Sequence, residues 1–153
     1  MKKFNIFTLL IVFAFVFLLS CSSSITSNET SENNLNNFPD ASMVVIEDTI
    51  TKTGVTVEFE YTGSNQGQYG AWYSIEVYQD DQWQELPYII DNVAFNAMAY
   101  LVETGVKKQQ VIVWEWLYGE LASGRYRVTI NFIDHVGPGD YSEFLLSSEF
   151  EIE

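Results

Sequence analysis

Apolar and polar residues alternate along most of the chain between residues 43 and 153. The clearest example is the run of Val55, Val57, Phe59 and Tyr61, whose members are separated by a threonine and two glutamates. Such alternation is typical of a strand with one buried face and one exposed face. The pattern predicts strands over residues 43–50, 54–62, 71–79, 82–87, 97–103, 107–114, 124–134 and 143–152.

Turn-forming residues separate these runs. Glycine-containing stretches such as 52–54, 63–70 and 137–140 interrupt the alternation, and only residues 115–121 are expected to form a helical turn. Short strands at regular spacing, without a helical period, are typical of two packed antiparallel sheets. The sequence therefore predicts an all-β fold, an antiparallel β-sandwich of about seven or eight strands over residues 42–153.

The first twenty residues differ from the rest of the chain. A basic start, Met1-Lys2-Lys3, precedes an almost wholly apolar run from Phe4 to Leu19. As a helix this run would measure about 24 Å, which is less than the roughly 30 Å hydrocarbon core of a membrane. The segment is therefore interpreted as an export signal and not as a permanent transmembrane helix.

The end of this run, Leu18-Leu19-Ser20-Cys21, resembles the lipobox of bacterial lipoproteins. The resemblance implies that residues 1–20 are a signal peptide and that Cys21 becomes the new N-terminus, carrying a diacylglyceryl group. Two acyl chains, such as palmitate, provide the stable anchoring that one chain cannot. The expected location is the cell membrane, on its extracytoplasmic face, with membrane contact through the lipid anchor.

Residues 21–41 are expected to form a flexible polar tether after the lipidated cysteine. Twelve of the twenty residues from Ser22 to Ala41 are serine, threonine or asparagine, and the isolated apolar residues show no period. Such a segment cannot bury enough apolar surface to offset its loss of conformational entropy. As a flexible coil it would hold the following domain about 25 Å from the membrane.

The composition excludes several classes of function. With 21 acidic against 7 basic residues, the formal net charge of −14 opposes binding to nucleic-acid phosphates. One cysteine excludes an intramolecular disulfide, and one histidine excludes a zinc site with several histidines. No cofactor or metal is expected, although a calcium site built from acidic loops stays open. Arg125 and Arg127 are expected to face Glu149 and Glu151 across the sheet as exposed ion pairs.

Residues 114–127, with the sequence W-E-W-L-Y-G-E-L-A-S-G-R-Y-R, resemble part of a bacterial immunoglobulin-like domain common on exported proteins. The recurring pattern is W-x-x-L-Y-G-x-L-x-x-G-x-Y-R. The resemblance implies an immunoglobulin-like sandwich in which Leu121, Gly124 and Tyr126 form a tyrosine corner, with the phenol hydroxyl bonded to a backbone group. Val128 stands where antibody domains carry a disulfide cysteine, so packing alone must stabilise the sandwich.

Candidate chemistry is sparse. His135 follows Asp134 in the loop expected between the last two strands, but the sequence has no G-x-S-x-G motif or comparable nucleophile. An enzyme is therefore not expected.

Aromatic residues are the candidates for a binding surface. Trp72 and Tyr78 lie on the opposite phase of their strand from the core residues, whereas Trp116, Tyr69 and Tyr141 lie in or beside expected loops. They either cover the outer face of a sheet and fill loop cores, or form a platform for a sugar ring or a partner protein.

The sequence predicts a lipid-anchored, extracytoplasmic immunoglobulin-like lipoprotein that serves as a non-catalytic interaction or accessory module. Two alternatives stay open. One is a cell-wall glycan-binding module that uses Trp72, Tyr78 or Trp116, and the other is an inhibitor of an extracellular enzyme that inserts residues 135–141.

Overall fold

The computed structural model describes residues 34–153. They form β1 (Ala41–Val45), η1 (Glu47–Thr49), β2 (Gly54–Tyr61), β3 (Gln66–Gln79), β4 (Gln82–Glu85), β5 (Tyr100–Val102), β6 (Lys108–Val113), α3 (Glu115–Tyr118), β7 (Gly124–Gly137) and β8 (Asp140–Ile152). The predicted signal peptide, Cys21 and the tether as far as residue 33 lie outside the described residues. Within residues 34–153, no helix has the length and apolar character needed to cross a membrane.

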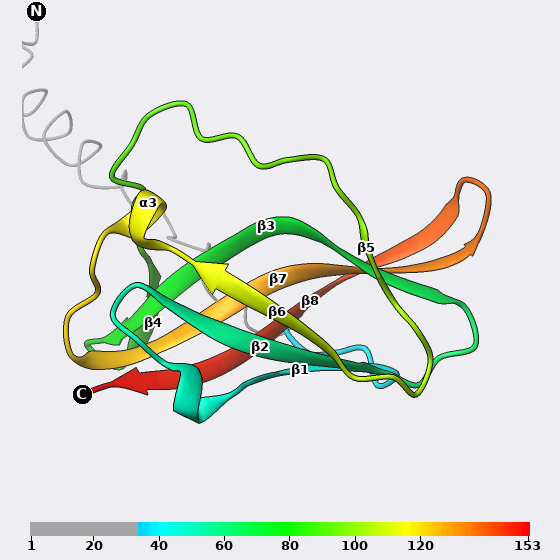
Figure 1. The fold of residues 1–153 in the computed structure, drawn as a ribbon, viewed down its shortest axis with the longest axis horizontal. Coiled ribbons are helices and arrows are strands. Elements are labelled where there is room, and N and C mark those ends of the chain that lie inside the picture. Colours follow the sequence, from blue (N-terminus) through cyan, green and yellow to red (C-terminus); the bar gives the residue numbers. More distant parts are fainter. Residues whose placement is uncertain (1–33) are drawn as a thin grey trace, which may run out of the picture.

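The strands form two antiparallel sheets that pack face to face (Figure 1). The smaller sheet has the strand order β1-β2-β6, and the larger has the order β4-β3-β7-β8. β5 pairs with residues 67–69 of β3, whereas β4 pairs with residues 76–79 of the same strand. The predicted all-β antiparallel sandwich is therefore confirmed.

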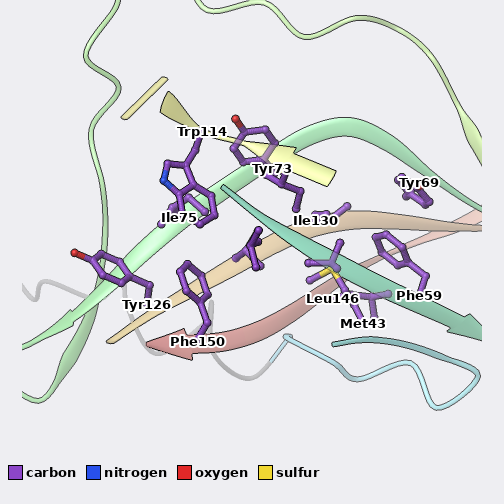
Figure 2. Packing of buried hydrophobic residues seen from close by; sticks show 14 of the residues in the cluster. Met43, Phe59, Tyr69, Tyr73, Ile75, Trp114, Tyr126, Ile130, Leu146 and Phe150 are labelled. Atoms are coloured by element: carbon purple, nitrogen blue, oxygen red, sulfur yellow. The ribbon is translucent and has the colours of Figure 1, made fainter. Parts of the chain in front are cut away.

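The core lies between the inner faces of the two sheets (Figure 2). The four apolar residues that alternate along β2 are at most 2% exposed, and each such burial contributes about 1.5–3 kcal/mol. Aromatic stacks join the sheets. Phe59 of β2 stacks on Tyr69 of β3 with ring centroids 4.2 Å apart, and Trp114 stacks on Phe150 of β8 at 5.4 Å.

β3 begins earlier than the sequence predicts. The stretch 63–70 is predicted to be a turn, but residues 66–70 belong to β3. The glycine at position 67 is needed for close packing and not for a turn. A Cβ atom on Gly67 would lie 2.8 Å from the ring of Phe132 and 3.0 Å from that of Tyr61. Tyr69, expected beside a loop, is 1% exposed in the core.

β7 and β8 extend further than predicted and form a long hairpin that projects at one end of the molecule (Figure 1). The sequence predicts a loop between residues 134 and 143. In the structure His135 pairs with Tyr141, and the connection is reduced to a tight turn. Gly139 makes this turn feasible, because its φ of 76° lies in the left-handed region that glycine adopts without strain.

Contacts with the sandwich begin inside the segment predicted to be a tether. Leu35 forms a parallel bridge with Leu145 of β8, and the Asn36 N–H donates to the Leu145 carbonyl oxygen at 2.8 Å. The Phe38 ring stacks on that of Phe144, with centroids 4.0 Å apart and planes 5° from parallel. These contacts precede the predicted domain start at residue 42, because local polarity does not reveal a few apolar residues that dock on a distant strand.

The connection between β4 and β5 is longer than predicted. Residues 86–99 have no regular structure, because the strand predicted over 97–103 is limited to Tyr100–Val102. The strand predicted over 43–50 likewise ends at Val45 and is followed by the helical turn η1.

Candidate interaction sites

Tyr126 lies at the start of β7 and closes the turn that precedes this strand. Its hydroxyl donates a hydrogen bond to the Ala122 carbonyl oxygen at 2.9 Å. Gly124 lies beside the Tyr126 ring, where a Cβ atom would be in ordinary van der Waals contact at 3.4 Å. Leu121 is buried, and its N–H donates to the Lys52 carbonyl oxygen at 2.9 Å. The three residues of the predicted tyrosine corner thus come together, in a structural role.

Tyr78 lies on the outer face of the larger sheet, where its ring contacts side chains of the same chain. The Trp83 ring is 5.1 Å away between centroids, and the Arg125 guanidinium lies 4.8 Å from the Tyr78 centroid. The Arg127 guanidinium in turn lies 4.6 Å from the Trp83 centroid. These cation–π contacts leave little of the Tyr78 face for a ligand.

The prediction of exposed ion pairs with β8 is confirmed for Arg125 and is wrong for Arg127. Arg127 is buried and forms its ion pair with Glu76 of β3, with a second hydrogen bond of 2.8 Å, so it is not an exposed partner of β8. Arg125 pairs with Glu149, at 2.5 Å, although its register partner is Glu151. The reason is that long side chains reach diagonally across a sheet, and Trp83 covers the Arg127 head group.

Trp72 lies on the outer face of β3, beside the register shift between Tyr69 and Tyr73. It is 37% exposed and borders an open hollow of about 580 Å³ together with Asn131 and Phe144. The hollow also includes part of the segment before β1, so this surface is partly covered by the chain itself.

Trp116 lies in α3 and borders a second pocket, between β3, β6 and the connection 86–99. The pocket has a volume of about 460 Å³ and aromatic walls formed by Tyr73, Phe95, Tyr100 and Trp116. We call it the β6 pocket. Trp116 is 44% exposed, and its ring meets the Phe95 ring edge to face, with centroids 5.8 Å apart. Burial raises the pKa of Tyr73 to about 12.

Tyr141 lies on the projecting hairpin, away from the other candidates. Its ring is 5.7 Å from that of His135 between centroids, and Val136 beside them is exposed. His135 therefore lies in a strand, opposite an aromatic ring, and not in an open loop. Among residues 34–153, no three histidine, cysteine or acidic side chains gather in a way that could hold a metal ion.

A buried polar cluster lies at the base of the hairpin, and the sequence does not reveal it. The Tyr61 hydroxyl donates to Asp134 Oδ1 at 2.5 Å, and the Asn65 amide donates to Asp134 Oδ2 at 2.9 Å. Burial, followed by the Asp134 carboxylate, raises the pKa of Tyr61 to about 12. Both carboxylate oxygens have partners, so the cluster fixes β2 against β7 and does not present a reactive group.

The four aromatic candidates therefore do not form one platform. Trp72 and Tyr78 share the outer face of the larger sheet but have different neighbours, and Tyr141 lies on the hairpin. Trp116 lines a different pocket, together with three other aromatic residues. The sequence pattern does not identify Phe95 and Tyr100 as members of this group. The available signal was the stretch after β4, which shows neither alternation nor helical period.

A family model described as a bacterial Ig-like domain matches residues 37–151. The match spans the sandwich from the residues just before β1 to the penultimate residue of β8. No match was found among curated proteins or among solved structures.

Proposed function

The chain belongs to the family of bacterial Ig-like domains, and from this premise we propose that it acts as a non-catalytic interaction module. We further propose that a lipid on Cys21 holds it at the extracytoplasmic face of the cell membrane. The observation that carries the first part is the family match over residues 37–151, because this fold commonly presents loops and sheet faces to partners.

The sequence before the sandwich supports the location. A basic start, an apolar run and the lipobox-like Leu18-to-Cys21 segment are the features of an exported, lipid-modified protein. The acidic composition favours the same arrangement, since a domain of net negative charge is repelled by an anionic bilayer surface and stays at the end of its tether.

The packing of the sandwich supports a role in binding at its surface. The space between the sheets is filled by the buried apolar cluster, and the buried Asp134 is engaged by Tyr61 and Asn65. Partner recognition would therefore take place at the surface, where tryptophan and tyrosine side chains are exposed.

The location is tested with Cys21→Ala in the full chain, expressed in a bacterium that processes lipoproteins. The wild-type protein is expected in the membrane pellet and in the detergent extract of that pellet. Cys21→Ala is expected to appear as an unprocessed precursor or in the soluble fraction, whereas Ser22→Ala is expected to behave as wild type. A Cys21→Ala protein that is still processed and membrane-bound would refute lipidation.

The inhibitor alternative is favoured by one observation, the exposed hairpin that carries Val136 and Tyr141. A photoreactive amino acid at position 141 separates it from recognition at other surfaces. Crosslinking to a protein from position 141 in intact cells, but not from position 72, would indicate that the hairpin is the contact surface. The reverse pattern would exclude the hairpin.

A further inference from the structure

The outer edge of β6 is open. The Trp114 N–H donates to the Thr53 carbonyl oxygen at 2.9 Å, and this continues the register in which alternate residues of β6 face β2. In the residues between them, the backbone N–H and C=O groups point the other way. The backbone N–H and C=O groups of Val111 and Val113 therefore point away from β2. Among the described residues, no strand pairs with this side of β6. Both valines line the β6 pocket.

Side chains already occupy the carbonyl oxygens of this edge. The Val111 oxygen accepts a hydrogen bond from the Gln110 amide nitrogen, and the Val113 oxygen accepts one from the Tyr73 hydroxyl, each at 2.9 Å. An added strand needs both donors and acceptors along the edge, so these side chains oppose pairing with another chain. The two N–H groups are the donors that the edge leaves for a ligand.

The connection 86–99 forms the roof of the pocket. It is fastened where the Ile89 N–H donates to the Leu117 carbonyl oxygen at 2.8 Å and where Phe95 packs against the core. Irregular connections of this length in compact domains are usually functional or disordered. This one places Phe95 edge to face against Trp116, at an interplanar angle of 69°, so that both rings form part of the wall.

The lining indicates an uncharged ligand that carries oxygen acceptors. None of the described residues around the pocket is charged, although the chain has a formal net charge of −14. The Asn96 side-chain oxygen accepts the Met98 N–H at 3.2 Å, which leaves its amide nitrogen as a further donor. A volume of about 460 Å³ lies in the usual range for small-molecule sites.

We propose that the β6 pocket binds one neutral sugar ring of a glycan, stacked on Trp116 and hydrogen-bonded to the backbone N–H groups of Val111 and Val113. A sugar ring combines an apolar C–H face with hydroxyl and ether oxygens, which matches aromatic walls and free N–H donors. An anionic sugar would be repelled by the net charge of the chain. The inference rests on the proposed function, because it names a ligand class for the interaction module.

The test uses the full chain, purified in a detergent whose headgroup is not a sugar. The probes are β-1,4-linked tetramers of N-acetylglucosamine, of glucose and, as the anionic control, of glucuronate, measured by saturation-transfer NMR and tryptophan fluorescence. At least one neutral tetramer is expected to bind with a Kd of about 1 mM or lower, and the anionic tetramer at least tenfold more weakly. Binding of neither neutral tetramer, or equal binding of the anionic one, would overturn the proposal.

Variants locate the site. Trp116→Ala is expected to weaken binding about tenfold, while Trp72→Ala, on the outer face of the larger sheet, leaves it unchanged. Val111→Pro removes an N–H that points away from β2 and should also weaken binding. Gln109→Pro removes the equivalent N–H outside the pocket and should not.

Asn96→Ala covers the case in which Trp116→Ala fails to fold, because Asn96 is exposed on the connection 86–99. It is expected to weaken binding severalfold. Binding that is unaffected by Trp116→Ala, Val111→Pro and Asn96→Ala places the sugar elsewhere and refutes the site. The fractionation of Cys21→Ala is independent of all these measurements, so the membrane location and the ligand class can fail separately.

Discussion

The Tyr126 hydroxyl donates a hydrogen bond to the Ala122 carbonyl oxygen, at 2.9 Å, across the turn that leads into β7. The bond joins residues only four positions apart, and the Tyr126 ring stacks on Phe150 with centroids 5.7 Å apart. One side chain thus fixes the entry into β7 and fills the core below it. No disulfide can perform this task in a chain with a single cysteine.

Tyr126→Phe is expected to lower the free energy of unfolding by about 1 kcal/mol, because it removes this hydrogen bond and keeps the ring. Urea denaturation followed by tryptophan fluorescence measures the change. Tyr141→Phe is the matched control, since Tyr141 is exposed on the hairpin. Equal stability of the two variants would mean that the bond contributes nothing to the corner.

Gly67→Ala is expected to cost about 1–3 kcal/mol, because the added methyl group would overlap the rings of Phe132 and Tyr61. Gly70→Ala is the control, since the nearest atom to its Cβ would be 4.0 Å away, at the Trp72 backbone nitrogen. Thermal or urea unfolding compares the two. If Gly67→Ala is no less stable than Gly70→Ala, the contact between the rings and Gly67 is looser than the structure indicates.

The two ion pairs on the outer face of the larger sheet are expected to differ in strength. Glu76→Gln removes a carboxylate that pairs with the buried Arg127 guanidinium and should cost about 2 kcal/mol or more. Glu149→Gln disrupts an exposed pair with Arg125 and should change stability by at most about 1 kcal/mol. Urea denaturation at low and high salt measures both, and similar losses would contradict the different burial of the two arginines.

Alternation along the chain was sufficient to predict the sandwich, because one buried face per strand leaves a period of two in the sequence. The predicted boundaries of strands and of the tether were wrong where the same residue type occurs in two kinds of structure. Gly67 lies in a glycine-rich stretch typical of turns, yet it makes room for two rings. The segment around Asn36 is polar like a tether, yet the Asn36 side chain bonds to Ser147, 111 positions away.

The candidate site was only partly visible for a related reason. The position of an aromatic residue in the alternating pattern of a strand shows whether its side chain faces the core, and for Trp72 it does not. The pattern does not show which residues from other parts of the chain lie nearby. Phe95 and Trp116 belong to different connections, and only the path of residues 86–99 over α3 and β6 brings them together. Such proximity depends on topology, which the period of a single strand does not contain.

The sandwich is expected to lose stability as the pH rises from about 10 to about 12, because buried tyrosines resist ionisation. Burial raises the pKa of Tyr69 and of Tyr73 to about 12, against an ordinary value of about 10. Between these values the unfolded chain releases phenol protons that the folded protein keeps. The unfolded state then binds fewer protons, so the free energy of unfolding falls with pH, and this contribution is fully present only below about pH 10.

Tyr69→Phe tests this expectation at a residue that is 1% exposed. The variant keeps the ring stacked on Phe59 and loses only a hydrogen bond of 3.2 Å to Gln110, so its unfolding free energy at pH 7 should be within about 1 kcal/mol of wild type. Its decline between pH 10 and pH 12 should be shallower, since one fewer phenol ionises preferentially in the unfolded chain. Urea denaturation at stepped pH measures the slope, with Tyr141→Phe as the exposed control expected to decline like wild type. Identical slopes for all three proteins would show that Tyr69 ionises without unfolding, and that the stack between β2 and β3 admits water.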